Sequence, residues 1–125
     1  MKIFLFVIFL SFLSCSFSEK NSEYTKIKFD KLNFDFGTIK VNDSVEFNFN
    51  FENKGNSILN VNKVKPSCNC TVPEWTKKSV EKNTGGIIKV KYSSNYPKVF
   101  SESITVYYNG KNSPVILTIS GEVVY

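Results

Sequence analysis

The 125-residue sequence contains no histidine, and this absence removes a large part of enzyme chemistry. No imidazole is available as a general base, as a member of a catalytic triad or as the commonest metal ligand. The thiols, amines, phenols and carboxylates that remain form no recognisable catalytic arrangement along the chain. We therefore predict that the protein is not an enzyme and that it carries no cofactor and no resident metal ion.

Arginine is absent as well, so that all 16 basic residues are lysines. Proteins that read nucleic acids depend on the forked guanidinium group and on clustered positive charge. Here the lysines are scattered along the sequence among 11 acidic residues, with a net charge of +5. This pattern predicts a solvated surface and no nucleic-acid partner.

What the sequence does contain is a strong β pattern. The aromatic share is 15%, with twelve phenylalanines, and aromatic residues suit strands. A chain of this length forms one domain. The clearest strand lies within residues 44–52, where polar residues alternate with an apolar set made of Val45, Phe47, Phe49 and Phe51.

Further period-two segments cover residues 27–41, 58–64, 87–92, 100–108 and 115–125. Asn42-Asp43 and Asn109-Gly110 are turn signals, and Gly37 predicts a bend or bulge within the first segment. Outside the N-terminal residues no helical period is found. The sequence therefore predicts an all-β fold, a two-sheet antiparallel β-sandwich of about seven strands over residues 27–125.

Residues 1–14 have the three parts of a signal peptide, which are Lys2, an apolar run over residues 3–13 and the small residue Ser14. The run is too short to span a bilayer as a helix. Phe12-Leu13-Ser14-Cys15 resembles the bacterial lipobox, in which the cysteine is acylated and becomes the first residue after cleavage. This resemblance implies a lipoprotein with palmitate or a similar acyl group on Cys15. The alternative is an ordinary secretory signal that is cleaved nearby.

Residues 15–26 would then be the lipidated cysteine followed by a polar tether without apolar periodicity. Two or more acyl chains hold a protein on a membrane where one chain would not. No aspartate follows Cys15, so the inner-membrane retention signal of many bacterial lipoproteins is missing. We expect the protein to be lipid-anchored in the cell envelope, at the outer membrane and facing the periplasm.

Four groups of residues resemble the family called domain of unknown function 1573 (DUF1573), which is found mostly in bacterial secreted proteins and lipoproteins. The resemblance covers about residues 27–125 and implies an immunoglobulin-like sandwich similar to the Hydin and major sperm protein domains, which act as binding modules. The matching residues are Phe34-Asp35-Phe36-Gly37, then Phe49, Phe51, Asn53 and Gly55, then Ser67-Cys68-Asn69-Cys70-Thr71, and finally Ile119, Gly121 and Val123.

Two positions depart from the family pattern. Asn69 stands where glycine is usual, and asparagine tolerates the left-handed backbone region better than most residues. Asn83-Thr84-Gly85 stands where Pro-Gly is usual.

Cys68 and Cys70 lie two residues apart, so in an extended segment both side chains face the same way. They can close a small disulfide ring, which would be strained in a strand because the α-carbons lie near the upper limit for bridging. A strained ring is easily reduced, as in redox-active pairs. They can also bind a soft ion such as Cu(I), or be small buried residues packed near Trp75. Zinc would need further ligands, from carboxylates or a second molecule.

Trp75 follows Pro73 and is interpreted as a core contact that closes one end of the sandwich, with a ligand-stacking platform as the alternative. The function predicted from the sequence is a membrane-tethered, non-catalytic binding or assembly module with an unknown protein partner in the envelope. Strand addition at an exposed sheet edge is one way to hold that partner. The alternative is a thiol-based periplasmic redox or copper-handling factor that uses Cys68 and Cys70.

Overall fold

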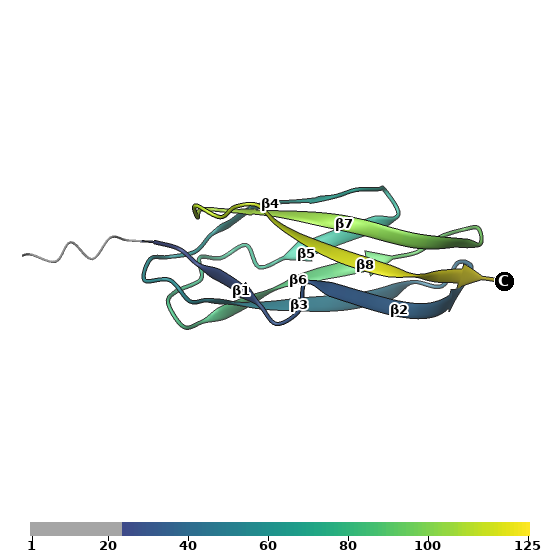
Figure 1. Cartoon of the computed structure of the whole chain (residues 1–125), viewed down its shortest axis with the longest axis horizontal. Helices are drawn as coiled ribbons and strands as arrows, with labels where there is room; N and C mark the ends of the chain where they lie inside the picture. Colours follow the sequence, from purple (N-terminus) through teal and green to yellow (C-terminus); the bar gives the residue numbers. More distant parts are fainter. Residues whose placement is uncertain (1–23) are drawn as a thin grey trace, which may run out of the picture.

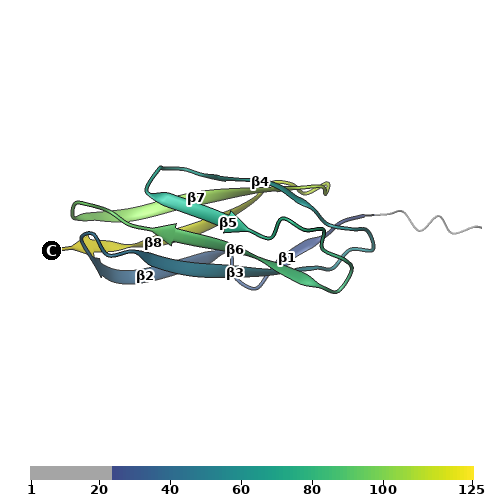
Figure 2. The ribbon, with the colours of Figure 1, turned by 180° about the vertical axis from the view of Figure 1, so that it is seen from behind.

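The computed structural model describes residues 24–125, which form eight strands in two facing sheets (Figures 1 and 2). One sheet has the strand order β1-β3-β6-β5 and the other β2-β8-β7-β4. No helix able to cross a bilayer occurs in this part of the chain. The strands are β1 (Ile27–Phe29), β2 (Asn33–Lys40), β3 (Val45–Asn53), β4 (Val61–Pro66), β5 (Thr71–Trp75), β6 (Gly85–Tyr92), β7 (Lys98–Tyr108) and β8 (Val115–Val124).

The predicted two-sheet sandwich is confirmed, with three refinements. There are eight strands, because the cysteine-containing segment continues into a strand, β5, that pairs with β6. One pair is parallel, since β2 runs alongside β8 in the same direction while the other pairs are antiparallel. The first apolar segment is broken after Phe29, so that β1 joins one sheet and β2 the other.

The core lies between the sheets and follows the alternation seen in the sequence. On β3, Phe49 and Phe51 are buried, whereas Asn48 and Asn50, which alternate with them, are exposed. Burying one such apolar side chain contributes about 1.5–3 kcal/mol. The other fully buried apolar side chains include Ile88, Val90 and Tyr92 on β6, Ile104 and Val106 on β7, and Leu117 and Ile119 on β8.

The predicted irregularity at Gly37 is confirmed and has a packing partner on β8. Gly37 has a positive φ of 69°, and the register between β2 and β8 shifts between Asp35 and Thr38. A β-carbon on Gly121 would lie 2.8 Å from the Gly37 carbonyl oxygen and 2.7 Å from Cζ of the buried Phe100. Glycine at 121 therefore lets the bulge and the Phe100 ring pack against β8.

The molecule has two distinct ends along its long axis (Figures 1 and 2). The described chain enters at one end, where residues 54–60, 76–84 and 109–114 connect the strands; we call this the entry end. The opposite end holds the connections of residues 41–44 and 93–97 and the C-terminus. The backbone N–H of Val41 donates to the Val124 carbonyl there.

The last three residues assigned to the tether belong to the ordered entry end. The Tyr24 N–H donates to Asn56 Oδ1 at 2.8 Å, and the Thr25 hydroxyl donates to the Asn109 carbonyl at 2.6 Å. Gly55 lies against this segment, since a β-carbon there would be 2.4 Å from the Tyr24 carbonyl oxygen. The predicted signal peptide of residues 1–14 and the predicted lipidation site at Cys15 lie outside the described residues.

Candidate functional site at the disulfide

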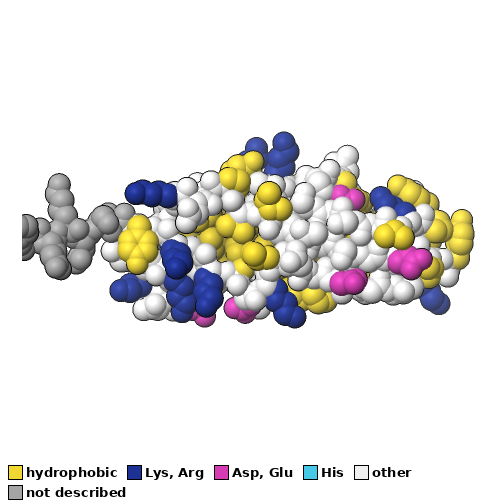
Figure 3. Space-filling view, viewed as in Figure 1, with side chains coloured by type: hydrophobic (Ala, Val, Ile, Leu, Met, Phe, Trp, Pro, Cys, Tyr) yellow, Lys and Arg dark blue, Asp and Glu magenta, His cyan; other side chains and the backbone are white. Residues whose placement is uncertain are grey.

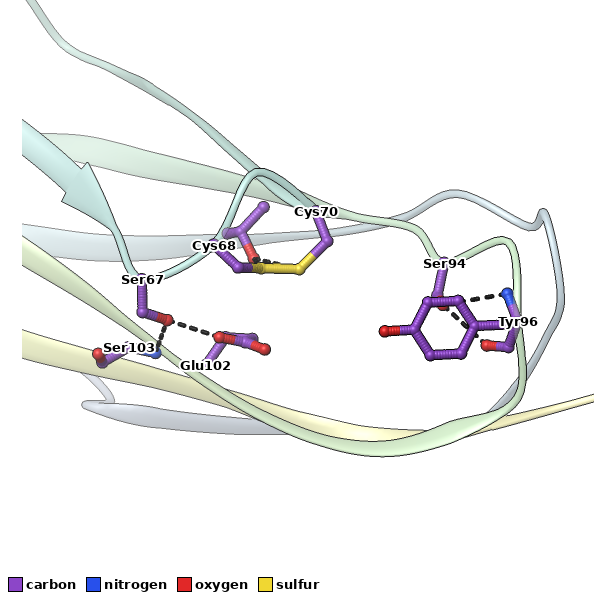
Figure 4. Close-up of a disulfide and its surroundings, with 8 residues drawn as sticks. Ser67, Cys68, Cys70, Ser94, Tyr96, Glu102 and Ser103 are labelled. Carbon is purple, nitrogen blue, oxygen red and sulfur yellow. Dashed lines mark hydrogen bonds between the residues drawn. A yellow bond between two sulfur atoms is a disulfide. The ribbon is translucent and has the colours of Figure 1, made fainter.

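Cys68 and Cys70 form a disulfide in the turn that joins β4 to β5 (Figure 4). Their α-carbons are 5.3 Å apart, well inside the usual range for a bridge. The expectation of an extended segment is wrong here, because residues 67–70 turn and the Thr71 N–H donates to the Cys68 carbonyl at 3.3 Å. The turn brings the α-carbons closer than a strand would.

Asn69, inside this turn, does not take up the left-handed conformation considered for it. Among the non-glycine residues of the described chain, Asn42 and Asn83 have a positive φ, of 66° and 60°. Of the two departures from the family pattern, it is therefore the second, at Asn83 in the connection between β5 and β6, that has the left-handed conformation.

The disulfide rests on the start of β5 and on the connection between β6 and β7. The Thr71 hydroxyl, which is buried, lies 3.6 Å from Cys68 Sγ and 3.9 Å from Cys70 Sγ. The Ser93 N–H donates to the Cys70 carbonyl at 3.3 Å, and Cys70 packs against the core. The ring is therefore held from both sides of the turn.

A glutamate faces the disulfide from β7. Glu102 lies on the same face of β7 as the buried residues Phe100 and Ile104, so its side chain points between the sheets (Figure 4). Its carboxylate oxygen and the two cysteine sulfurs all lie within 4.8 Å of one another. Glu102 Oε2 accepts a hydrogen bond from the Ser67 hydroxyl at 2.6 Å, which fixes the carboxylate beside the ring.

Sequence reasoning missed Glu102, although a signal for it exists. In a strand, residues at i, i+2 and i+4 share a face. Glu102 is the acidic residue in the otherwise apolar face made by Phe100, Ile104 and Val106. A carboxylate on the core face of a strand is costly unless it is partnered or reaches water, and therefore marks a site.

A polar cleft of about 480 Å³ opens beside the disulfide, and we call it the disulfide cleft. Across the cleft from the sulfurs lies Tyr96, whose side chain is 56% exposed (Figure 4). Lys98 Nζ lies 5.4 Å from the centre of the Tyr96 ring. The cleft is lined by Asn42, Cys68, Cys70, Ser93, Ser94, Asn95, Tyr96 and Lys98.

Two groups near this cleft have shifted pKa values. Burial raises the pKa of Tyr92 above its ordinary value of 10.0, against the opposing effect of the Lys98 charge. Burial by itself would lower the pKa of Lys98, but the hydrogen bond with Tyr96 and neighbouring charges raise it overall. Lys98 therefore keeps its positive charge at the rim of the cleft.

Trp75 lies at the far end of β5 from the disulfide, so the cysteines do not pack near it. Four residue steps separate Thr71 from Trp75, or about 13 Å along a strand. Trp75 is partly buried against the core, and Lys77 Nζ lies 3.3 Å from the centre of its ring. A smaller hollow of about 210 Å³ lies beside the ring. The two candidate sites of the sequence are therefore separate.

Solved structures with this fold come from unrelated settings. A Porphyromonas gingivalis protein of unknown function matches with a TM-score of 0.66 and 9% identity, over 82% of this chain and 48% of that one. The seventh PapD-like domain of human CEP192 matches with a TM-score of 0.68 and 10% identity, over 83% of this chain and 89% of that one. The secreted serine protease VesC of Vibrio cholerae matches with a TM-score of 0.56 and 12% identity, over 82% of this chain and 23% of that one.

These similarities define the class of the fold, which is the PapD-like, immunoglobulin-like β-sandwich. At these identities the likeness concerns the fold alone. The chain spans about half of the Porphyromonas gingivalis protein. The chain belongs to the family described as protein of unknown function DUF1573, whose model matches residues 27–123. No curated protein matches the sequence.

Proposed function

We propose that the protein is a lipid-anchored, non-catalytic binding or assembly module of the bacterial cell envelope, which presents the disulfide cleft to a protein partner. The anchor is the acylated Cys15, and the protein lies at the outer membrane facing the periplasm. The observation that carries the proposal is that the entry of the chain and the disulfide cleft lie at opposite ends of the sandwich. The chain enters at one end, whereas Asn42 and residues 93–96 of the cleft belong to connections at the other.

The composition of the cleft favours a protein partner. Exposed tyrosine is enriched at protein interfaces, where its ring gives contact area and its hydroxyl a hydrogen bond. Tyr96 supplies such a group and Lys98 supplies a charge. The Ser94 hydroxyl donates to the Tyr96 carbonyl at 2.8 Å, which braces the loop that carries the tyrosine.

The sheet edges are less suited to hold a partner by strand addition. β5 has Pro73 at its centre, β4 carries Lys63, Lys65 and Pro66, and β1 has three residues. β2 is interrupted by the bulge at Gly37. Lysine, proline, bulges and short length are the features by which natural sheets discourage edge pairing. The cleft is therefore the better candidate for recognition.

The test is capture of partners from native envelopes by the membrane-purified protein after cross-linking. Tyr96→Ala is compared with Tyr107→Ala, which removes another exposed tyrosine, on the outer face of β7. The proposal expects loss of the captured protein with the first variant and normal capture with the second. Equal capture by both would contradict a role for the cleft, and the intact mass of the protein reports acylation of Cys15 separately.

A second candidate is a thiol-based redox or copper-handling factor, and the observation that favours it is Glu102 beside the disulfide. Reduction by an external dithiol would yield two thiols on Cys68 and Cys70 and a disulfide on the reductant. Glu102 could then accept a thiol proton, and two thiolates could bind Cu(I).

The two candidates differ in what removal of the cysteines does. The redox candidate expects the pair to be reduced by mild dithiol and the double variant Cys68→Ser/Cys70→Ser to lose function while folded. It also expects Glu102→Gln to change the pH dependence of thiol alkylation in the reduced protein. A disulfide that resists mild reductant, with full function in the double variant, would dismiss this candidate.

A further inference from the structure

The positive charge of the protein is gathered at its entry end. Residues 24–125 contain fourteen lysines and nine acidic residues. Residues 24–26, 54–60, 76–84 and 109–114 hold six of those lysines and one acidic residue, Glu81, which leaves eight of each sign elsewhere. Within residues 24–125, the excess of lysines over acidic residues therefore lies entirely in these four ranges, which we call the entry segments. The six lysines are Lys26, Lys54, Lys77, Lys78, Lys82 and Lys111.

The sequence did not reveal this surface because its lysines are up to 85 positions apart, between Lys26 and Lys111. The fold brings them together, since residues 24–26 and three connections meet at one end of the sandwich. On the face shown in Figure 3, lysine side chains gather toward this end with acidic side chains next to them, and both kinds also lie over the middle and near the opposite end. All six lysines are exposed, and one of them, Lys54, forms an ion pair with Glu52 of β3 at 2.6 Å.

Apolar side chains accompany these charges. Tyr24 and Ile58 are 48% and 51% exposed, and both belong to the entry segments. A hollow of about 380 Å³ lies between Tyr24, Lys26, Asn109 and Lys111. The end therefore combines amines for an anionic group, amide hydrogen-bond donors and an aromatic ring of the kind enriched at membrane interfaces.

We propose that the entry end docks on the anionic headgroup surface of the membrane to which the protein is anchored. The proposal rests on the lipid anchor at Cys15. Nine residue steps separate Cys15 from Tyr24, so the chain between them spans at most about 30 Å. Exposed lysines act on anionic lipids within a Debye length of about 8–10 Å, so the anchor must bring the surface close.

Docking would set the orientation of the whole sandwich. With the entry end on the headgroups, the long axis points away from the membrane (Figure 1). Asn42 and residues 93–96, which line the disulfide cleft, then lie at the outer end. A tether alone would let the domain rotate freely. The charged end thus converts an anchored domain into an oriented one.

The test is lysine footprinting by amine acylation of the membrane-purified, lipidated full-length mature protein, read by mass spectrometry. The protein is reconstituted into vesicles of phosphatidylcholine with or without phosphatidylglycerol. We expect the six entry-end lysines to react severalfold more slowly in the anionic vesicles, and the exposed Lys40, Lys63 and Lys65 to react equally in both. High salt should abolish the difference because it screens the charges. Equal reactivity of all lysines in both vesicles would overturn the proposal.

A matched pair of triple variants isolates the role of charge. Lys77→Gln/Lys78→Gln/Lys82→Gln should lower the protection of Lys26, Lys54 and Lys111 at least threefold. Lys40→Gln/Lys63→Gln/Lys65→Gln, which has the same net charge, should leave it unchanged. Equal effects of the two variants would overturn the proposal in favour of a non-specific effect of net charge.

Failure of the anchor and failure of docking give different results. Detection of an unacylated N-terminal peptide by mass spectrometry would show that Cys15 carries no anchor, and it would contradict the proposed function together with docking. Acylated protein without protection of the six lysines overturns docking alone. Protection by an acidic polypeptide added to neutral vesicles, with none from phosphatidylglycerol, would assign this end to a protein partner and overturn the proposal.

Discussion

The side chain of Asn53 donates a hydrogen bond to the carbonyl of Val80, which is 27 positions further along the chain, at 3.0 Å. The same amide donates to the Ser57 carbonyl at 2.8 Å, and its oxygen accepts from the Gly55 N–H at 3.0 Å. Asn53 is fully buried. One asparagine therefore joins two connections of the entry end, which explains the Asn-x-Gly element of the family pattern in physical terms.

Replacing Asn53 by alanine should destabilise the protein strongly. The change removes all three bonds and leaves the Gly55 N–H and the Ser57 carbonyl without the partner they have here, whereas the Val80 carbonyl keeps the Leu59 N–H. Each group without a partner costs about 1–3 kcal/mol. We expect the free energy of unfolding in denaturant to fall by about 2–4 kcal/mol. Asn50→Ala, at an exposed position on the same strand, is the control and should change stability by under about 0.5 kcal/mol. Similar losses from both variants would refute the role of the Asn53 bonds.

Gly121→Ala should also reduce stability, for a steric reason. The added methyl group would meet the Gly37 carbonyl and the Phe100 ring, and this ring is locked by stacking on Tyr92 at a centroid distance of 3.8 Å. Overpacking of this kind costs about 1–3 kcal/mol. Thermal unfolding followed by circular dichroism measures the loss. Ser120→Ala, on the outer face of β8, should melt like the original protein, and an unchanged melting temperature for Gly121→Ala would count against this packing.

Stability should fall at alkaline pH because of the buried tyrosines. Burial raises the folded-state pKa of Tyr92 and of Tyr108 above 10.0, so the unfolded chain loses these protons first as pH rises. The free energy of unfolding keeps its full value with respect to these groups below about pH 10, and it falls as pH rises from there through the folded-state pKa values. Denaturant titrations from pH 8 to 11 should show the decline, and Tyr92→Phe should flatten it. A slope unaffected by that substitution would show that other groups are responsible.

Tyr92→Phe should be neutral or stabilising near neutral pH. The Tyr92 hydroxyl is buried and has no hydrogen-bond partner among the described residues, so removing it relieves a desolvation cost of about 1–3 kcal/mol. The ring stacking on Phe100 would be retained. Tyr107→Phe, at a partly exposed position, provides the comparison and should have no effect. A loss of more than about 1 kcal/mol at pH 7 for Tyr92→Phe would show that the hydroxyl is satisfied.

The parts of the fold that could be predicted from the sequence are those set by local periodicity. The alternation around Phe49 and Phe51 on β3 identified a strand with one buried face. β5 was missed because Pro73 and the cysteines interrupt the pattern. It becomes a strand by pairing with β6 from Thr71↔Tyr92 to Trp75↔Ile88, and an edge position tolerates the missing N–H of proline.

The candidate site depended on contacts that local pattern does not encode. Cys68 and Cys70 were recognised as a pair, but the turn that sets their geometry and the approach of Glu102 from β7 are tertiary features. Tyr96 reaches the same cleft from the connection between β6 and β7. Likewise, the charge at the entry end arises from residues 24–26 and three connections that are distant in sequence.

The interrupted edges have a consequence for behaviour at high concentration. Proteins confined to a surface meet copies of themselves far more often than they do in solution, and an uninterrupted edge would template intermolecular sheets. The row of backbone groups that such growth requires is interrupted by Pro73 on β5 and by the bulge of β2 at Gly37, while the lysines of β4 add like charges that repel a second copy. These features disfavour edge-to-edge pairing between copies of the sandwich, also where the copies are crowded together.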